Sequence, residues 1–105
     1  MSWKESYAMN VGVAKITLHL PGCFSLKDKR RVVSSVRDRV RSKFNVAVAE
    51  VDQNDAWQTA VIGITCVSNN VRHADQTLDN VLAFIESDRP DAEVIDCEME
   101  TLTGF

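Results

Sequence analysis

Apolar and polar residues alternate along four stretches of the chain, and each alternation predicts a strand with one buried face. The predicted strands are residues 11–20, 45–52, 57–68 and 92–101. In the first of them, Ile16 and Leu18 share one face while Lys15 and Thr17 share the other. In the last, apolar residues alternate with acidic ones, and the apolar set is Ile95, Cys97 and Met99.

Two other stretches repeat with the helical period instead. Over 25–43, Leu26, Val33, Val36 and Val40 fall on one stripe at 100° per residue. Ser25 with Asp28 three residues later is close to a capping box, which favours a helix start at Ser25. Over 70–87, apolar residues again recur at helical spacing: Val71, Ala74, Leu78, Val81, Leu82 and Ile85. Arg89-Pro90 predicts the end of this second helix.

The order strand, helix, strand, strand, helix, strand predicts an α+β fold of the ferredoxin-like βαββαβ type. We expect a four-stranded antiparallel sheet of order 4-1-3-2, counted along the chain, with both helices on one face. A length of 105 residues fits one domain over 1–105, and the polar, mixed residues 1–9 are expected to form a flexible arm.

Positive charge is concentrated in the first predicted helix. Residues 25–43 hold eight basic and two acidic side chains, a net charge of +6, whereas the whole chain has a net charge of −3 and the remainder therefore −9. A basic element in an acidic protein favours contact with an anion such as RNA or a ribosomal surface. The candidate contacts are Lys27, Lys29, Arg30, Arg37 and Arg41. The alternative is a solvated helix whose arginines pair with acids of the same fold or of a neighbouring subunit.

Lys29 departs from the helical pattern, because it falls on the apolar stripe one turn from the helix start. One interpretation is a lysine whose stem crosses apolar surface so that its ammonium reaches solvent at the end of the sheet. The other is a lysine that faces an anion held by the loop of residues 23–25 and the helix N-terminus.

The sheet face opposite the helices is expected to lack aromatic residues, so base stacking on the sheet is not predicted. This face should instead carry Val13, Val61 and Val67. Uncovered apolar surface of this kind favours an interface, and we expect a homo-oligomer. Trp57, at the mouth of the hairpin between the second and third strands, is either a lid on the core or an interface anchor, and the lid is slightly favoured.

Reactive chemistry finds little support in the sequence. Neither histidine has a nucleophile in a recognisable pattern, and no phosphate-binding glycine motif is present. Glu50, Asp52 and Asp55 are interpreted as a solvated acidic turn, because they match no calcium loop. We therefore predict no catalytic residues, no metal, no cofactor and no enzyme activity.

The sequence lacks patterns of disulfide pairing, membrane insertion and export, and this bears on where in the cell the protein is expected. The three cysteines form no CxxC pair and predict reduced thiols rather than disulfides. No apolar run approaches the roughly 20 residues that span a membrane, so no membrane contact is predicted. The first residues lack a signal-peptide pattern, which predicts a cytoplasmic location.

Several segments resemble a known family. PGCFSLKDKRR at 21–31, FNVAVAEVDQNDAWQ at 44–58, and VSNN at 67–70 followed by a helix with HAD at 73–75 are similar to the small YlxP-like bacterial proteins, a domain of unknown function. The resemblance runs from Val11 to Thr101 and implies a ferredoxin-like fold without an established activity. Genes of such proteins often lie beside those for translation initiation and ribosome-binding factors, which implies a connection with RNA or the ribosome.

Together these observations predict a small cytoplasmic binding factor whose first helix contacts RNA or a ribosomal surface. The alternative is a homo-oligomeric protein-interaction module with no nucleic-acid role.

Overall fold

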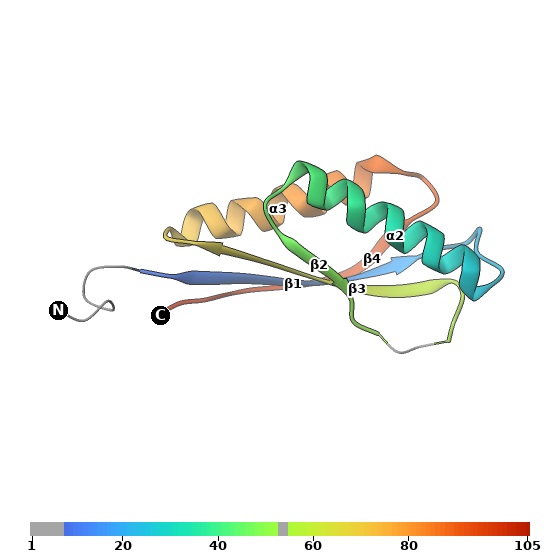
Figure 1. Cartoon of the computed structure of the whole chain (residues 1–105), viewed down its shortest axis with the longest axis horizontal. Helices are drawn as coiled ribbons and strands as arrows, with labels where there is room; N and C mark the ends of the chain where they lie inside the picture. Colours follow the sequence, from blue (N-terminus) through green and yellow to red (C-terminus); the bar gives the residue numbers. More distant parts are fainter. Residues whose placement is uncertain (1–7, 53–54) are drawn as a thin grey trace.

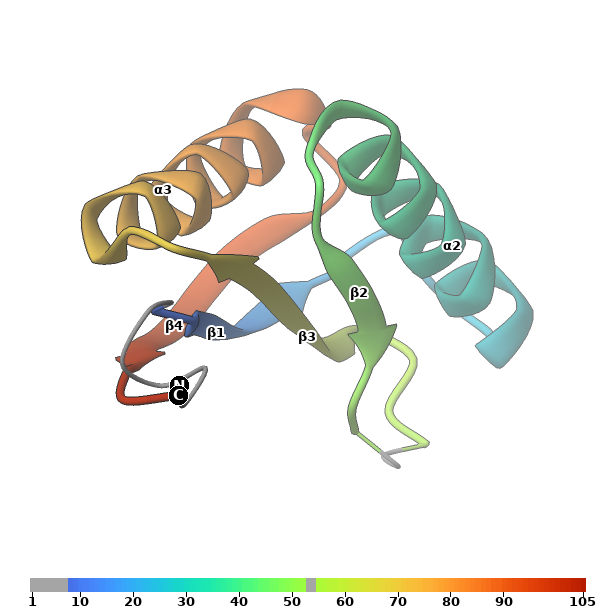
Figure 2. The ribbon, with the colours of Figure 1, turned by 60° about the vertical axis from the view of Figure 1, so that its left-hand side comes forward.

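Four antiparallel strands form one sheet in the order β2-β3-β1-β4, and two helices cover one of its faces (Figures 1 and 2). A computed structural model describes residues 8–52 and 55–105. The elements are β1 (Asn10–His19), α2 (Leu26–Lys43), β2 (Ala47–Glu50), β3 (Thr59–Ser68), α3 (Val71–Asp88) and β4 (Glu93–Leu102). The ferredoxin-like fold class and the strand order are confirmed. The arm expected over 1–9 lies outside the described residues except for Ala8 and Met9.

β1 is the centre of the sheet, because it pairs with β3 on one side and β4 on the other. Its alternation places Ile16 and Leu18 under the helices, where both are fully buried. Ile62, opposite Ile16 on β3, is buried on the same face. The predicted parity of these strands is confirmed, and the core lies between this face of the sheet and the two helices.

α2 begins with a reciprocal cap. The Ser25 hydroxyl accepts a hydrogen bond from the Asp28 amide (3.0 Å), and the Asp28 carboxylate accepts one from the Phe24 amide (3.1 Å). Three valines of the predicted stripe, Val33, Val36 and Val40, are buried. These bonds satisfy two backbone amides at the helix start and fix the direction from which the chain enters the helix.

α3 begins at Asn70, whose side-chain oxygen accepts a hydrogen bond from the His73 amide (3.1 Å). Its buried stripe is Ala74, Leu78, Val81 and Ile85. Val71 is expected in this stripe but is 40% exposed at the first position of the helix.

β2 is shorter than predicted, four residues in place of eight. After α2 the chain turns at Phe44, whose carbonyl accepts a hydrogen bond from the Val46 amide (3.0 Å), so pairing with β3 begins only at Ala47. β3 likewise begins at Thr59, since Trp57 and Gln58 form a turn. β2 is therefore a short edge strand beside a long central one.

β4 carries a bulge that changes which side chains it buries. Asp96 lies opposite Thr17, but Val94 rather than Ile95 lies opposite Leu18. Val94 packs against the core, while Ile95 is 57% exposed. The expected alternation of Ile95 with Cys97 and Met99 is therefore wrong at Ile95, because the register shift inserts one residue at this point.

Because of this bulge, we expect truncation of Val94 to lower the stability of the protein more than truncation of the larger Ile95. Val94→Ala should lower the free energy of unfolding by about 1 kcal/mol, since methyl groups packed on the core are lost. Ile95→Ala removes more atoms but should cost less than about 0.5 kcal/mol, because the side chain is mostly in water. Urea unfolding of both variants measures the difference. A larger loss for Ile95→Ala would contradict the bulge.

Candidate nucleic-acid interface

The side of α2 that faces α3 uses its basic residues to join the two helices. Arg39 donates two hydrogen bonds to the Asp88 carboxylate, at 2.7 Å from Nε and 2.5 Å from Nη2. This pairing holds the pKa of Asp88 below its usual range, mainly through the hydrogen bond with Arg39. The Lys43 ammonium lies 4.7 Å from the centre of the Phe84 ring. Arg39 therefore pairs with an acid of the same fold, as the alternative of a solvated helix expects, while Lys43 lies against a ring of α3.

Another set of cations lies on the opposite side of the helix. At 100° per residue, Lys27, Arg30, Arg31, Arg37 and Arg41 share one sector of about 120°, in which Arg31 is nearest to Arg39 and lines a hollow with Asp28 and Asp91. We call these five residues the basic flank. Figure 2 shows α2 and α3 side by side over the sheet, with α2 on the side of the edge strand β2.

Four members of the basic flank have no acidic partner in the part of the chain that the structure describes. Arg37 pairs with its neighbour Asp38 (3.1 Å), whereas Lys27, Arg30, Arg31 and Arg41 are exposed and form no ion pair with residues 8–52 or 55–105. The structure thus brings four of the predicted contacts onto one surface. It adds Arg31, which the sequence argument counted among the basic residues but not among the contacts.

Lys29 does not belong to this surface. Its side chain is only 4% exposed, and its ammonium lies 3.3 Å from Asp52 Oδ2, 3.6 Å from Glu50 Oε2 and 3.2 Å from the Ala56 carbonyl oxygen. The ammonium therefore reaches neither solvent nor an anion beside residues 23–25. The assignment of Lys29 to the contact surface is corrected, because carboxylates of the β2–β3 hairpin enclose its charge.

The acidic turn is solvated only in part, since Asp55 is exposed whereas Asp52 packs against α2. The Asp52 side chain is 11% exposed, and its Oδ1 atom is buried without a hydrogen-bond partner among the described residues. Glu50 at the end of β2 and Asp52 two residues later lie on the helix side of the sheet, where Lys29 projects from the first turn of α2. This ion cluster fastens the β2–β3 hairpin to α2.

The ion cluster makes Lys29 a stabilising residue. Lys29→Met should lower the free energy of unfolding by about 3–5 kcal/mol, because two carboxylates then lose their buried cation. Lys27→Met, two residues away on the exposed flank, should change it by less than about 0.5 kcal/mol. Urea unfolding compares the two.

The triple variant Lys29→Met, Glu50→Gln, Asp52→Asn should recover part of the stability that Lys29→Met loses, since it leaves no unpaired charge. Equal stability of Lys29→Met and Lys27→Met would show that the cluster contributes nothing.

The thiols are suited to packing rather than to reaction. Cys23 and Cys66 are buried, and all three cysteines are free. Burial raises the pKa of Cys23, Cys66 and Cys97 above the usual value, with nearby carboxylates adding to the effect. All three are therefore protonated at neutral pH, and a thiol is a weak nucleophile. In residues 8–52 and 55–105, no group of three or more His, Cys, Asp or Glu residues is placed to hold a metal ion.

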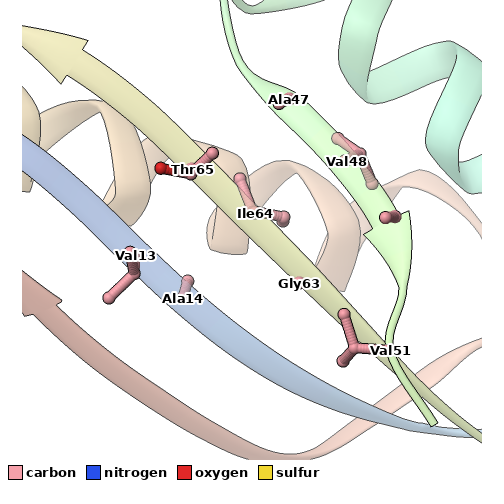
Figure 3. A pocket seen from close by; sticks show the side chains of 9 residues that line it. Val13, Ala14, Ala47, Val48, Val51, Gly63, Ile64 and Thr65 are labelled. Carbon is pink, nitrogen blue, oxygen red and sulfur yellow. The ribbon is translucent and has the colours of Figure 1, made fainter.

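The open face of the sheet is divided into an apolar and an acidic half. On β4, Asp96, Glu98 and Glu100 lie opposite Thr17, Lys15 and Val13 of β1. Lys15 pairs with Glu98 (3.4 Å). Towards β2 the face is apolar, and it contains a hollow of about 340 Å³ (Figure 3). The hollow is lined by Val13, Ala14, Ala47, Val48, Ala49, Val51, Gly63, Ile64 and Thr65.

Small residues create this hollow. A Cβ atom at Gly63 would lie 2.9 Å from Val51 Cγ1, so glycine allows the Val51 side chain to lie against β3. Val13 and Val61 are half-buried on this face, while Val67 is 65% exposed. These valines lie on the predicted face. Trp57 does not cover the core, since it is 50% exposed in the turn before β3, and the favoured lid interpretation is corrected.

Sequence reasoning overlooked Phe24. It directly precedes the cap residue Ser25 and is 68% exposed, more than any other large apolar residue among those described. In a hydrophobic staple, the residue at this position packs on the fifth residue after it, which here is Lys29. Lys29 points to Asp52 instead, so Phe24 has no staple partner. The signal available in the sequence was an aromatic residue before the cap with a lysine at the staple position.

The sheet order, the two helices on one face and the βαββαβ connectivity define a ferredoxin-like α+β protein. The chain belongs to the family described as "Protein of unknown function (DUF503)", whose model matches residues 11–99. The uncharacterized protein YlxP of Bacillus subtilis (strain 168) is 38% identical over 77 residues, which span 73% of this chain and 84% of that protein. The resemblance found in the sequence is confirmed.

A solved structure supports the fold alone. The de novo designed protein Foldit4 matches 89% of this chain and 96% of its own length with a TM-score of 0.52 and 14% identity. Among the described residues, neither helix combines the length and the apolar character that crossing a membrane requires. The cytoplasmic location stays a prediction.

Proposed function

We propose that the protein is a binding factor rather than an enzyme, and that its basic flank binds the phosphate backbone of RNA, free or on a ribosomal surface. The observation that carries the proposal is the group of Lys27, Arg30, Arg31 and Arg41, exposed and without acidic partners among the described residues. In a protein of net charge −3, acids were available for pairing, as Arg39 with Asp88 demonstrates.

The dimensions of the flank suit a polyanion. Lys27 and Arg41 are fourteen positions apart, which corresponds to a rise of about 21 Å along the helix axis. Phosphates recur along a nucleic-acid strand at intervals much shorter than this, so the flank can contact several of them. The gene neighbourhood implied by the family resemblance supports RNA as the polyanion.

The rest of the surface limits how RNA can approach. Exposed acids on β4 and α3 repel phosphate, and they include Asp75, Asp79, Asp96, Glu98 and Glu100. The open sheet face is acidic on one half and apolar on the other. Its lysine, Lys15, is paired with Glu98, and the four strands carry no Phe, Tyr or Trp on which a base could stack. Binding is therefore expected on the α2 side alone.

Salt dependence tests this proposal. Binding of a labelled RNA, followed by fluorescence anisotropy, should weaken with salt at a log–log slope of about −0.7 to −0.9 per phosphate contact. Replacing Arg30, Arg31 and Arg41 by glutamine should flatten the slope by about two units without a large loss of stability, since exposed charges contribute little to folding.

The matched control replaces three cations elsewhere, Lys15, Lys43 and Arg72, by glutamine, which changes the net charge equally. Its slope should stay that of the original protein. Equal slopes for both triple variants would contradict the flank as the site. A folded protein that binds no RNA at about 50 mM salt, where phosphate contacts are strong, would contradict the function itself.

A second function is favoured by the open sheet face, for which we propose a second copy of this chain as the partner. The hollow above Gly63 and the projecting Val67 lie on the same face of β3, four residues apart. Each copy can therefore offer a side chain that fills the hollow of the other, as a two-fold interface requires. The acids of β4 would repel their counterparts, which restricts contact to the apolar half.

A negative charge introduced at Val67 tests the proposed self-association. Val67→Glu should reduce the mass measured by sedimentation to that of one chain, because it buries a carboxylate against apolar surface. Val71→Glu, on an exposed position of α3, is the control and should associate like the original protein. Sedimentation of the original protein as a single chain at tens of micromolar, where an oligomer of micromolar affinity would form, would contradict this function.

A further inference from the structure

Phe24 is held in place by its backbone while its ring remains in water. Its amide donates to the Asp28 carboxylate, and the preceding Cys23 is buried, with its own amide bonded to the Leu20 carbonyl (3.1 Å). The residue is nevertheless 68% exposed. An aromatic side chain fixed at its base and left outside the core is ready to contact a partner without first being ordered.

Trp57 lies at the same end of the molecule. The Gln58 side chain next to it donates to the Pro21 carbonyl (3.3 Å), and the Leu20 amide donates to the Gln58 carbonyl (2.9 Å). On its other side, the Ala56 carbonyl accepts a hydrogen bond from Lys29 in the first turn of α2. The turn that carries Trp57 is thereby tied to both the loop before Phe24 and the start of α2, and Figure 1 shows this turn and the start of α2 at one end of the molecule.

Positive charge surrounds the start of α2. Lys27, Arg30 and Arg31 of the basic flank lie within the first two turns, and Asp28 opposes them with one negative charge. Lys29 contributes nothing outward, since Glu50 and Asp52 enclose its ammonium. Against these three cations stand Asp28 and the exposed Asp55 near Trp57, while Asp91 beside Arg31 is paired with Arg89. This end of the molecule therefore keeps a small net positive charge next to Phe24 and Trp57.

Exposed aromatic rings beside cations are the combination that binds unpaired bases. Bases of a single strand stack on aromatic side chains while neighbouring Lys and Arg hold the phosphates. Bases within a duplex are already stacked and paired, so rings at the end of a helix cannot reach their faces. A protein partner centred on Phe24 would need apolar surroundings, whereas the adjacent helical residues are Lys27, Asp28 and Arg31.

We propose that Phe24 and Trp57 form a base-stacking site at the N-terminal end of the basic flank, and that the site takes single-stranded rather than duplex RNA. This inference rests on the proposed function and names its substrate class. The arginines further along α2, Arg37 and Arg41, then hold phosphates of nucleotides that continue past the stacked bases.

The test compares a uridine strand of about twelve nucleotides, within the range of known single-strand sites, with a duplex of the same length. Phe24→Ala and Trp57→Ala should each weaken binding of the single strand about tenfold, with an unchanged salt slope because no cation is lost. The original protein should bind the duplex more weakly than the single strand. Neither aromatic substitution should change the affinity for the duplex. Leu102→Ala, an exposed apolar residue on β4, is the control and should bind both RNAs like the original protein.

Tryptophan fluorescence gives a second, direct measurement. The chain has two tryptophans, so Trp3→Phe leaves Trp57 as the single reporter. Stacking should quench its emission when the uridine strand is added, and the duplex should leave the emission unchanged.

The outcomes separate the two proposals. If the arginine variant flattens the salt slope while both aromatic variants bind the single strand like the original protein, the stacking site is overturned and the function stands. Equal affinity for strand and duplex, with no quenching, overturns it as well. If neither RNA binds the folded protein at low salt, the proposed function falls and this inference with it. Loss of self-association in Phe24→Ala, with RNA affinity unchanged, assigns the ring to a protein contact instead.

Discussion

The ammonium of Lys29 lies between α2 and the β2–β3 hairpin, against the carboxylates of Glu50 and Asp52. This contact determines much of the surface around it. Because Lys29 faces the interior, the helix is rotated so that Arg30, Arg31 and Arg41 face water, and the hairpin turn with Trp57 is held beside the helix start. It also removes the apolar partner that Phe24 would have in a hydrophobic staple. A buried ion cluster of this kind contributes more to a specific arrangement than to net stability, since desolvation offsets much of the attraction.

Charges are separated across the molecule along the direction of the sheet order. α2 lies near β2 and carries the exposed cations, whereas α3 and β4 at the other side carry exposed acids. The pair of Arg39 and Asp88 lies at the boundary, where the two helices meet. Such a distribution orients the protein toward a polyanion before contact and repels it from the acidic side, and this effect weakens as salt screens the charges.

The ferredoxin-like fold usually offers its open sheet face to ligands, but in this protein that face has a different character. The acids on β4 repel phosphate. The small apolar residues on β2 and β3 suit contact with another apolar surface. The exposed Phe24 and Trp57 lie instead at the end of the molecule, next to the start of α2. The sheet face and the basic flank are on different sides of the fold, so the proposed self-association and the proposed RNA binding need not compete for the same surface.

The order of the elements along the chain indicated the order of the strands in the sheet. Periodicity along the sequence determined the four strands, the two helices and the buried faces of β1, β3 and α2. These features depend on residues two to four positions apart, and local spacing records them. The family was also evident from SLKDKRR and FNVAVAEVD, and the position of four basic-flank residues followed from helical geometry. The tertiary structure alone decided the placement of Lys29, Ile95, Trp57 and Phe24. The partners of Lys29 are 21 and 23 residues away, and the bulge that exposes Ile95 arises in pairing with a strand about 80 residues earlier. Burial of such side chains depends on contacts between distant segments, which local spacing does not contain.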